Sequence, residues 1–253
     1  MTSRVMRTLV LGLLTTLASA STMGSPPLLG TIAMDPDIIT PEDPTTLSCV
    51  SYAGRGVRDA YDRRVGGWIR MEAYLFDAAF DDGSSVQIQV NPEFRSEVAA
   101  LALAEAYGRI LGQLPAVLRS GVRRVFVHRG RLPFAGGHDF VLIHTDQGEE
   151  YERDGILEET LVHEASHTSL DPLCAGAQGW RAAQKADGEY ISTYARDFPS
   201  REDVAESFLP YLAIRYRRDR ISSELAALIV STIPHRIDYF DGRCFDVHPW
   251  DTP

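Results

Sequence analysis

The chain has 253 residues, of which 44% are hydrophobic and 24% charged, with a formal net charge of -10 and a pI near 5.2. This is the composition of an ordinary globular protein, long enough for one substantial hydrophobic core and one catalytic unit. The acidic balance argues against a nucleic-acid partner, which would require a basic face.

The first residues have the three parts of a secretory signal peptide. Arg4 and Arg7 precede a short apolar run, Leu9–Leu17, and the small residues Ala18 to Ala20 follow it. The run is too short to span a bilayer, and no later segment is long and apolar enough to do so. We therefore expect residues 1–20 to be a signal peptide, cleaved near Ala20, and the protein to be secreted, extracellular or periplasmic, without stable membrane association.

The next segment, residues 21–51, is rich in proline, threonine and serine and lacks a periodic apolar pattern. We interpret it as a leader or linker and place the folded domain at residues 52–253. From Ala73 to Val90, two apolar runs flank a turn of the Asp-Asp-Gly type, which predicts a β-hairpin. Alanines and leucines at helical spacing predict a helix over Arg95–Leu114.

Two strands are expected beyond this helix, at Val122–His128 and Phe140–His144. A helix is predicted at Ile156–Leu170, and two more follow near Arg201–Arg217 and Ile221–Ile233. The order predicts an α+β fold in which a small mixed sheet packs on helices. If Phe140–His144 is an edge strand, an extended peptide could add to it by strand augmentation.

The helix at Ile156–Leu170 contains the most informative residues of the chain, the HExxH string from His163 to His167. Side chains four residues apart share a helical face, so both imidazoles can reach one metal ion. Glu164 is then free to act on a zinc-bound water. The string predicts one zinc ion per chain, held by three protein ligands with one position left open.

The third ligand has several candidates. The metzincin continuation requires glycine at position 170 and histidine at position 173, where this chain has leucine, so that class is excluded. Asp171 lies two turns beyond His163, and the proline after it indicates that it ends the helix. Glu202 and Glu206 are four residues apart on one helical face, and either could reach the metal.

The residues downstream of the string resemble a known family. The chain has Tyr194 and then the pattern E-x-x-A-E-x-F from Glu202 to Phe208, which resembles the gluzincins and more narrowly the group typified by anthrax lethal factor. The resemblance is confined to residues 163–208, and the gap between Tyr194 and Glu202 is a residue longer than in the family. It implies a zincin-like metallopeptidase domain with Glu202 as zinc ligand. It also implies that Glu206 is an outer carboxylate that orients a ligating histidine, and that Tyr194 is a hydroxyl donor to the transition state.

These observations predict a secreted zinc metalloendopeptidase that hydrolyses peptides or proteins, with Glu164 as general base and Tyr194 as oxyanion donor. Two alternatives stay open. The first is a catalytically inactive zincin-like binding or toxin-associated module, and the second is a secreted domain in which the motif arose by chance. The sequence indicates no substrate and no oligomeric state.

The three cysteines all lie in the part of the chain expected to be exported, where disulfides form. We expect one disulfide and one leftover thiol, with Cys174 and Cys244 as the pair, although the other two pairings stay open. A free Cys49 thiolate could alternatively occupy the open zinc position and keep the enzyme latent. The remaining histidines have no ligand spacing and are expected to be structural or surface residues: His128, His138, His144, His235 and His248.

Overall fold

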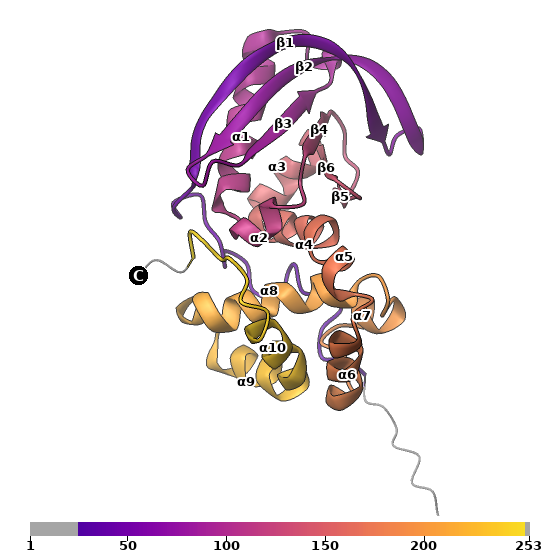
Figure 1. The fold of residues 1–253 in the computed structure, drawn as a ribbon, viewed down its shortest axis with the longest axis vertical. Helices are drawn as coiled ribbons and strands as arrows, with labels where there is room; N and C mark the ends of the chain where they lie inside the picture. Colours follow the sequence, from indigo (N-terminus) through magenta and orange to yellow (C-terminus); the bar gives the residue numbers. More distant parts are fainter. Residues whose placement is uncertain (1–24, 251–253) are drawn as a thin grey trace, which may run out of the picture.

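The computed structural model describes residues 25–250, and it has a six-stranded sheet at one end and a group of helices at the other (Figure 1). The predicted signal peptide lies outside the described residues. The strands are β1 (Leu47–Asp62), β2 (Gly67–Phe80), β3 (Ser85–Val90), β4 (Arg124–His128), β5 (Ala135–Gly136) and β6 (Phe140–His144).

The sheet is mixed, as predicted, with the strand order β1-β2-β3-β4-β6-β5. β1, β2 and β3 pair antiparallel, whereas β4 lies parallel to both β3 and β6. The condition for strand augmentation at Phe140–His144 is not met, because the loop after β4 turns back and pairs antiparallel on the outer side of β6. The exposed edge at this side of the sheet is therefore the two-residue strand β5.

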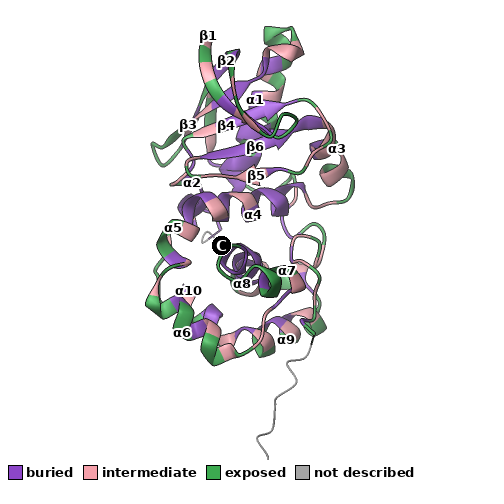
Figure 2. Ribbon diagram, turned by 90° about the vertical axis from the view of Figure 1, so that its right-hand side faces the viewer, coloured by how far each residue is buried: buried purple, intermediate pink, exposed green. Residues whose placement is uncertain are grey.

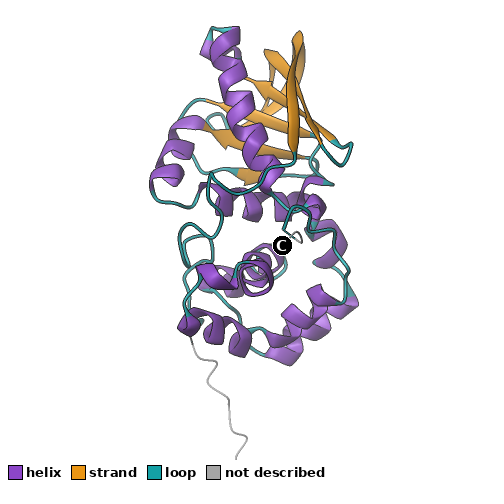
Figure 3. Cartoon of the chain, turned by 90° about the vertical axis from the view of Figure 1, so that its left-hand side faces the viewer, coloured by secondary structure: helices purple, strands orange, loops and turns teal. Residues whose placement is uncertain are grey.

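Helices cover one face of the sheet and form the rest of the molecule (Figure 3). The α-helices are α1 (Glu97–Gln113), α2 (Ala116–Arg119), α3 (Thr145–Arg153), α4 (Leu157–Ser169), α5 (Asp171–Cys174), α6 (Gln178–Asp187), α7 (Thr193–Asp197), α8 (Asp203–Tyr216), α9 (Ser223–Thr232) and α10 (Pro234–Asp241). Short 3-10 helices are η1 (Pro92–Phe94) and η2 (Arg218–Arg220). The helices predicted at Arg95–Leu114, Ile156–Leu170, Arg201–Arg217 and Ile221–Ile233 are confirmed, as α1, α4, α8 and α9. None of the helices in residues 25–250 is long and apolar enough to cross a membrane.

The core follows from the alternation of side chains along the strands. Val125 and Val127 of β4 point into the main core, which the helices share, whereas Phe126 between them points to the opposite face. There Phe126 packs in a second cluster with Phe140 of β6, and their ring centroids are 4.9 Å apart. Both faces of the central strands are thus buried, which fixes the register of the strands that lead to the site.

Residues 25–46 differ from the separate leader predicted for 21–51. They run along the helices without regular secondary structure, and Ile38 and Ile39 are 0% and 1% exposed in the main core. The backbone N–H of Ile39 donates a hydrogen bond to Glu159 of α4 at 2.8 Å. Isolated apolar residues that pack in an irregular segment leave no periodic pattern, so local sequence does not reveal that the segment belongs to the fold.

The expected disulfide between Cys174 and Cys244 is absent, and all three cysteines are free thiols. Cys174 is buried in the core beside Tyr239, and burial raises the pKa of its thiol, whereas Cys244 is exposed. Cys49 lies in β1, where it pairs with Ala79 of β2, and it is not among the residues that line the candidate metal site described below. The structure therefore gives no support to a latent form in which Cys49 binds the metal.

Candidate metal centre

The HExxH string lies on α4, which lies between the sheet and the helical half of the molecule (Figure 2). Almost the whole helix is buried, and α8 packs against it from the helical side. Glu202 occupies the N-cap position of α8, so the start of that helix brings its carboxylate to the histidines of α4. The seam between the two helices thus brings together two imidazoles and one carboxylate.

Three ligand atoms converge at this seam. Nε2 of His163 lies 3.1 Å from Nε2 of His167, and Oε2 of Glu202 lies 3.5 Å and 3.1 Å from these two nitrogens, respectively. They are the only group of three or more His, Cys, Asp or Glu side chains in residues 25–250 that could hold one metal ion. Glu202, rather than Glu206 or Asp171, therefore completes the set.

The donor set fits a zinc ion. A tetrahedral zinc with ligands at 2.0–2.1 Å has ligand atoms about 3.3–3.4 Å from one another, close to the three distances found here. Oε2 of Glu202 is buried and has no hydrogen-bond partner in the described chain, although a buried carboxylate oxygen is costly to leave unpaired. A cation bound between the three side chains would satisfy this oxygen.

Each of the two histidines also faces a second carboxylate through its other nitrogen. Nδ1 of His167 lies 2.8 Å from Oδ2 of Asp171, and Nδ1 of His163 lies 3.4 Å from Oε1 of Glu206. Such outer carboxylates fix the orientation and tautomer of ligating histidines, which leaves Nε2 of each ring available to a metal. Only the contact with Asp171 is a hydrogen bond, whereas Nδ1 of His163 makes none within the described residues and faces Glu206 as a neighbouring charge.

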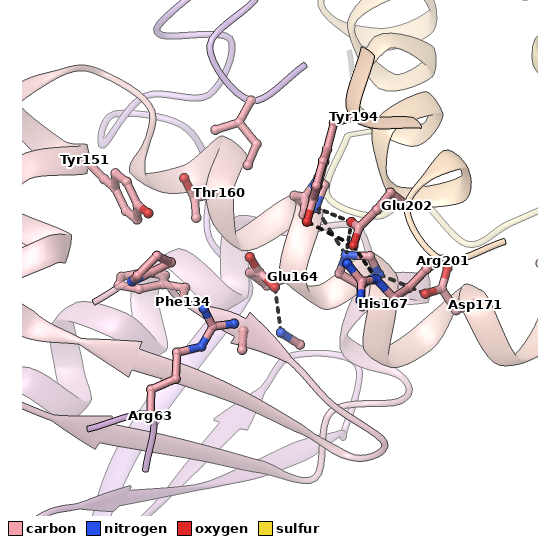
Figure 4. A pocket seen from close by; sticks show the side chains of 15 residues that line it. Arg63, Phe134, Tyr151, Thr160, Glu164, His167, Asp171, Tyr194, Arg201 and Glu202 are labelled. Atoms are coloured by element: carbon pink, nitrogen blue, oxygen red, sulfur yellow. Dashed lines mark hydrogen bonds and ion pairs between the residues drawn. The ribbon is translucent and has the colours of Figure 1, made fainter. Parts of the chain in front are cut away.

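The second oxygen of Glu202 is held by neighbours (Figure 4). Oε1 accepts a hydrogen bond from the hydroxyl of Tyr194 at 3.0 Å and another from Nε of Arg201 at 2.8 Å. Tyr194 lies in the first turn of α7 and is 39% exposed, and its ring stacks on that of His163 at a centroid distance of 6.5 Å. These bonds direct Oε2 toward the histidines, so Glu202 is set to bind through one oxygen.

The charges in the site attract one another strongly. Burial would lower the pKa of His167, but the hydrogen bond to Asp171 and the adjacent carboxylate of Glu202 outweigh it and raise the pKa to about 10. Burial would likewise raise the pKa of Glu202, but the two imidazoles hold it well below its usual range. An ionised carboxylate is the form that binds a divalent metal, whereas the proton on His167 would be released when a metal binds.

Glu164 lies beside the ligand set and points into the same pocket. Its Oε2 accepts a hydrogen bond from the backbone N–H of Gly136 in the edge strand β5, at 2.6 Å. A Cβ atom at Gly136 would lie only 2.0 Å from the main-chain oxygen of Glu164 and 2.8 Å from Cβ of His167. Glycine at this position is therefore what lets the edge strand approach the HExxH helix so closely.

The pocket above these residues has a volume of about 620 Å³. Phe134, Gly136 and Tyr151 line it together with the site residues, and Arg63 reaches it from the turn between β1 and β2 (Figure 4). A second, more apolar cavity of about 700 Å³ adjoins it, since both share Ile32, Tyr151, Thr160 and Tyr194. Its other walls come mainly from residues 27–34.

The site thus assembles every residue proposed from the sequence: His163, Glu164, His167, Tyr194, Glu202 and Glu206. Sequence reasoning missed the outer role of Asp171, for which the i,i+4 spacing from His167 was the available signal. It also missed Gly136 and the segment near Ile32, which local sequence does not connect to the site. Of the other histidines, His128 and His144 are buried side by side at the ends of β4 and β6, away from this pocket.

Comparisons with protein families, with curated proteins and with solved structures found no match to this chain.

Proposed function

We propose that the protein is a zinc-dependent metallopeptidase with a zincin-like domain. The observation that carries the proposal is the convergence of His163, His167 and Glu202, with atom separations of 3.1–3.5 Å, beside a second carboxylate, Glu164, in an open pocket. A structural zinc site prefers four protein ligands, whereas a catalytic site has three and keeps one position open. Three ligands and a free carboxylate are the arrangement that hydrolysis requires.

Zinc at this centre would lower the pKa of water and polarise a peptide carbonyl. The residues of this chain then supply the proton transfers. Glu164 takes the proton of the attacking water and returns it to the leaving amine, and the N–H of Gly136 holds its carboxylate in the pocket. Tyr194 is half-exposed, and its single hydroxyl proton is donated to Oε1 of Glu202; donation to the developing oxyanion would break this bond, with Arg201 left to hold Oε1.

The edge strand β5 offers a place for the substrate backbone. The N–H of Gly137 donates to the carbonyl of Phe140, the first residue of β6, whereas the N–H of Gly136 points away from β6 and donates to Glu164. An extended peptide laid along this edge would lie across the pocket beside Glu164, which keeps the N–H of Gly136. Such binding depends on main-chain groups and accommodates many sequences.

Export through the signal peptide at residues 1–20 is part of the proposal and rests on the sequence pattern alone. A secreted peptidase of this type would act on peptides or proteins outside the cytoplasm. Neither nucleic acid nor a membrane is part of the proposed reaction.

The test is the zinc content of purified protein after dialysis against metal-free buffer, followed by cleavage of an unfolded protein substrate. We expect about one zinc per chain. Glu164→Gln should keep the zinc and lose at least ~100-fold in activity, because the general base is gone. Glu224→Gln, an exposed change on α9 outside the pocket, is the matched control and should retain full activity.

The possible outcomes separate the candidate functions. Bound zinc with cleavage that depends on Glu164 supports a peptidase. Bound zinc without any cleavage would favour the inactive binding module. Folded protein that binds no zinc would reduce the HExxH string to a chance motif and overturn the proposal.

A further inference from the structure

The segment at the start of the described chain lies against the residues that carry Tyr194. The N–H of Leu28 donates to the carbonyl of Ile191 at 3.3 Å, and the carbonyl of Leu28 accepts from the N–H of Thr193 at 2.8 Å. One residue further on, the carbonyl of Leu29 accepts from the N–H of Tyr194 at 3.1 Å. This short parallel pairing fixes the beginning of α7 to a segment far away in the sequence.

The same segment also reaches the carboxylate behind His163. The backbone N–H of Thr31 donates to Oε2 of Glu206 at 2.9 Å, and the hydroxyl of Ser192 donates to the same oxygen at 2.5 Å. Thr31 and Ser192 are both 0% exposed, and Glu206 is 1% exposed. With Oε2 held by two donors, Oε1 is the oxygen that faces Nδ1 of His163.

We propose that residues 28–31 are a positioning segment of the metal centre. The N–H of Thr31 fixes Glu206, whose Oε1 lies 3.4 Å from Nδ1 of His163. The attraction between this carboxylate and the imidazole holds Nε2 of the ring toward His167 and Glu202. The inference rests on the proposed metal centre and assigns a role to a part of the chain outside the HExxH and Glu202 helices. A positioning role can be told apart from a purely structural one. A segment that only held the fold together would affect the free energy of unfolding but not the affinity for metal.

Outer carboxylates influence the metal because they set the ring orientation and basicity of the ligand in front of them. A carboxylate that loses one of two buried donors reorients, since an unpaired buried oxygen is costly. Glu206 then no longer holds His163 in place. The segment therefore contributes to metal binding through a single backbone N–H, and the identity of the side chain at position 31 matters little.

Position 31 allows this N–H to be tested separately from the side chain. Thr31→Pro removes the N–H donor, whereas Thr31→Val keeps it and preserves the shape of the side chain. The hydroxyl of Thr31 has no hydrogen-bond partner in the described chain, so its loss in Thr31→Val removes no contact to Glu206. Ser192→Ala removes the second donor and is a further test in case Thr31→Pro does not fold. The same hydroxyl accepts from the N–H of Ala195 and caps α7, so Tyr194→Phe, which removes only the bond from α7 to Glu202, is measured beside it.

The measurement is zinc affinity, determined by competition with a chromophoric chelator, together with the visible spectrum of the cobalt(II)-substituted protein and the melting temperature of the metal-free form. Wild type and Thr31→Val should bind one zinc with equal affinity and give the same cobalt spectrum. Thr31→Pro and Ser192→Ala should each bind about tenfold more weakly, the lower end of the usual effect of outer-shell changes, with an altered cobalt spectrum.

Two results would overturn the inference in distinguishable ways. If wild type binds zinc and every folded variant binds it with unchanged affinity and cobalt spectrum, residues 28–31 only stabilise the fold, and the proposed function is unaffected. If wild type itself binds no zinc, the proposed function fails and this inference fails with it. A lower melting temperature of the metal-free variants without a change in affinity also counts against the inference.

Discussion

Gly136→Ala should damage both the stability and the activity of the protein, because β5 and α4 are in contact at this residue. The new Cβ would lie 2.0 Å from the main-chain oxygen of Glu164 and 2.8 Å from Cβ of His167. An ordinary contact is about 3.5 Å, so the strand and the helix would have to separate by roughly 1.5 Å. The atom in the way belongs to the backbone of a buried helix and cannot move aside as a flexible side chain would.

Overpacking of this kind costs about 1–3 kcal/mol in the free energy of unfolding. For a chain of this size the cost corresponds to a fall in melting temperature of roughly 2–12 °C. Glu164 and His167 are the residues displaced, and a shift of about 1 Å can cost about 100-fold in rate. The cleavage rate should therefore fall by about this factor even where the variant stays folded at the assay temperature. The assay is thermal unfolding of the metal-free protein, combined with initial rates of peptide cleavage at saturating zinc.

Gly176→Ala is the matched control for this change. Gly176 is exposed between α5 and α6, and a Cβ there would meet no atom within 4 Å. The control should melt within about 2 °C of wild type, since surface substitutions stay within about 0.5 kcal/mol. If Gly136→Ala behaved like Gly176→Ala in both assays, the close approach of β5 to the HExxH helix would be refuted.

Three further predictions concern the groups around the site and in the core. Burial raises the pKa of Glu159 to about 8 from 4.5, so its contribution to stability is complete below pH 4.5 and is lost as the pH rises to about 8. The melting temperature of wild type should therefore fall over this pH range, and Glu159→Gln should reduce that fall. An equal fall in wild type and variant would contradict the pKa assigned to Glu159. Asp171→Asn should weaken zinc binding by about 10–100-fold through the lost support of His167, as chelator competition would reveal, and equal affinity would exclude that support. Arg236 is fully buried between the carboxylates of Asp187 and Asp203. Arg236→Leu leaves both carboxylates buried without their cation, so the free energy of unfolding measured in urea should fall by about 3–5 kcal/mol. A fall below about 1 kcal/mol would mean that water reaches the two carboxylates.

The parts of the molecule that could be predicted from the sequence have strong local patterns. The HExxH helix was placed to within a residue at each end, because its apolar spacing and the proline after Asp171 both mark it. The pairing of His163 and His167 with Glu202 followed from a motif with a fixed spacing and from the family resemblance. These are features in which a few neighbouring residues determine the geometry.

The parts that could not be predicted depend on contacts between distant residues. β1 is an edge strand in which half of the residues are exposed and several positions are polar, so its sequence lacks the apolar alternation that identified β3. β5 has only two residues, too few for any pattern, and it exists because β6 offers an edge. The contact of Thr31 with Glu206 is made by a backbone N–H, which every residue except proline possesses, so no residue type at position 31 signals it.

The hydrogen bond between Thr31 and Glu206 joins residues 175 positions apart in the chain. Contacts of such long range form slowly, because a large loop must close before they are made. During synthesis the N-terminal segment emerges first and must wait until α8 has been made before it can dock. Metal affinity would therefore rise late in folding, and an incomplete chain would carry the two histidines of the string without the support that turns them into a tight binding site.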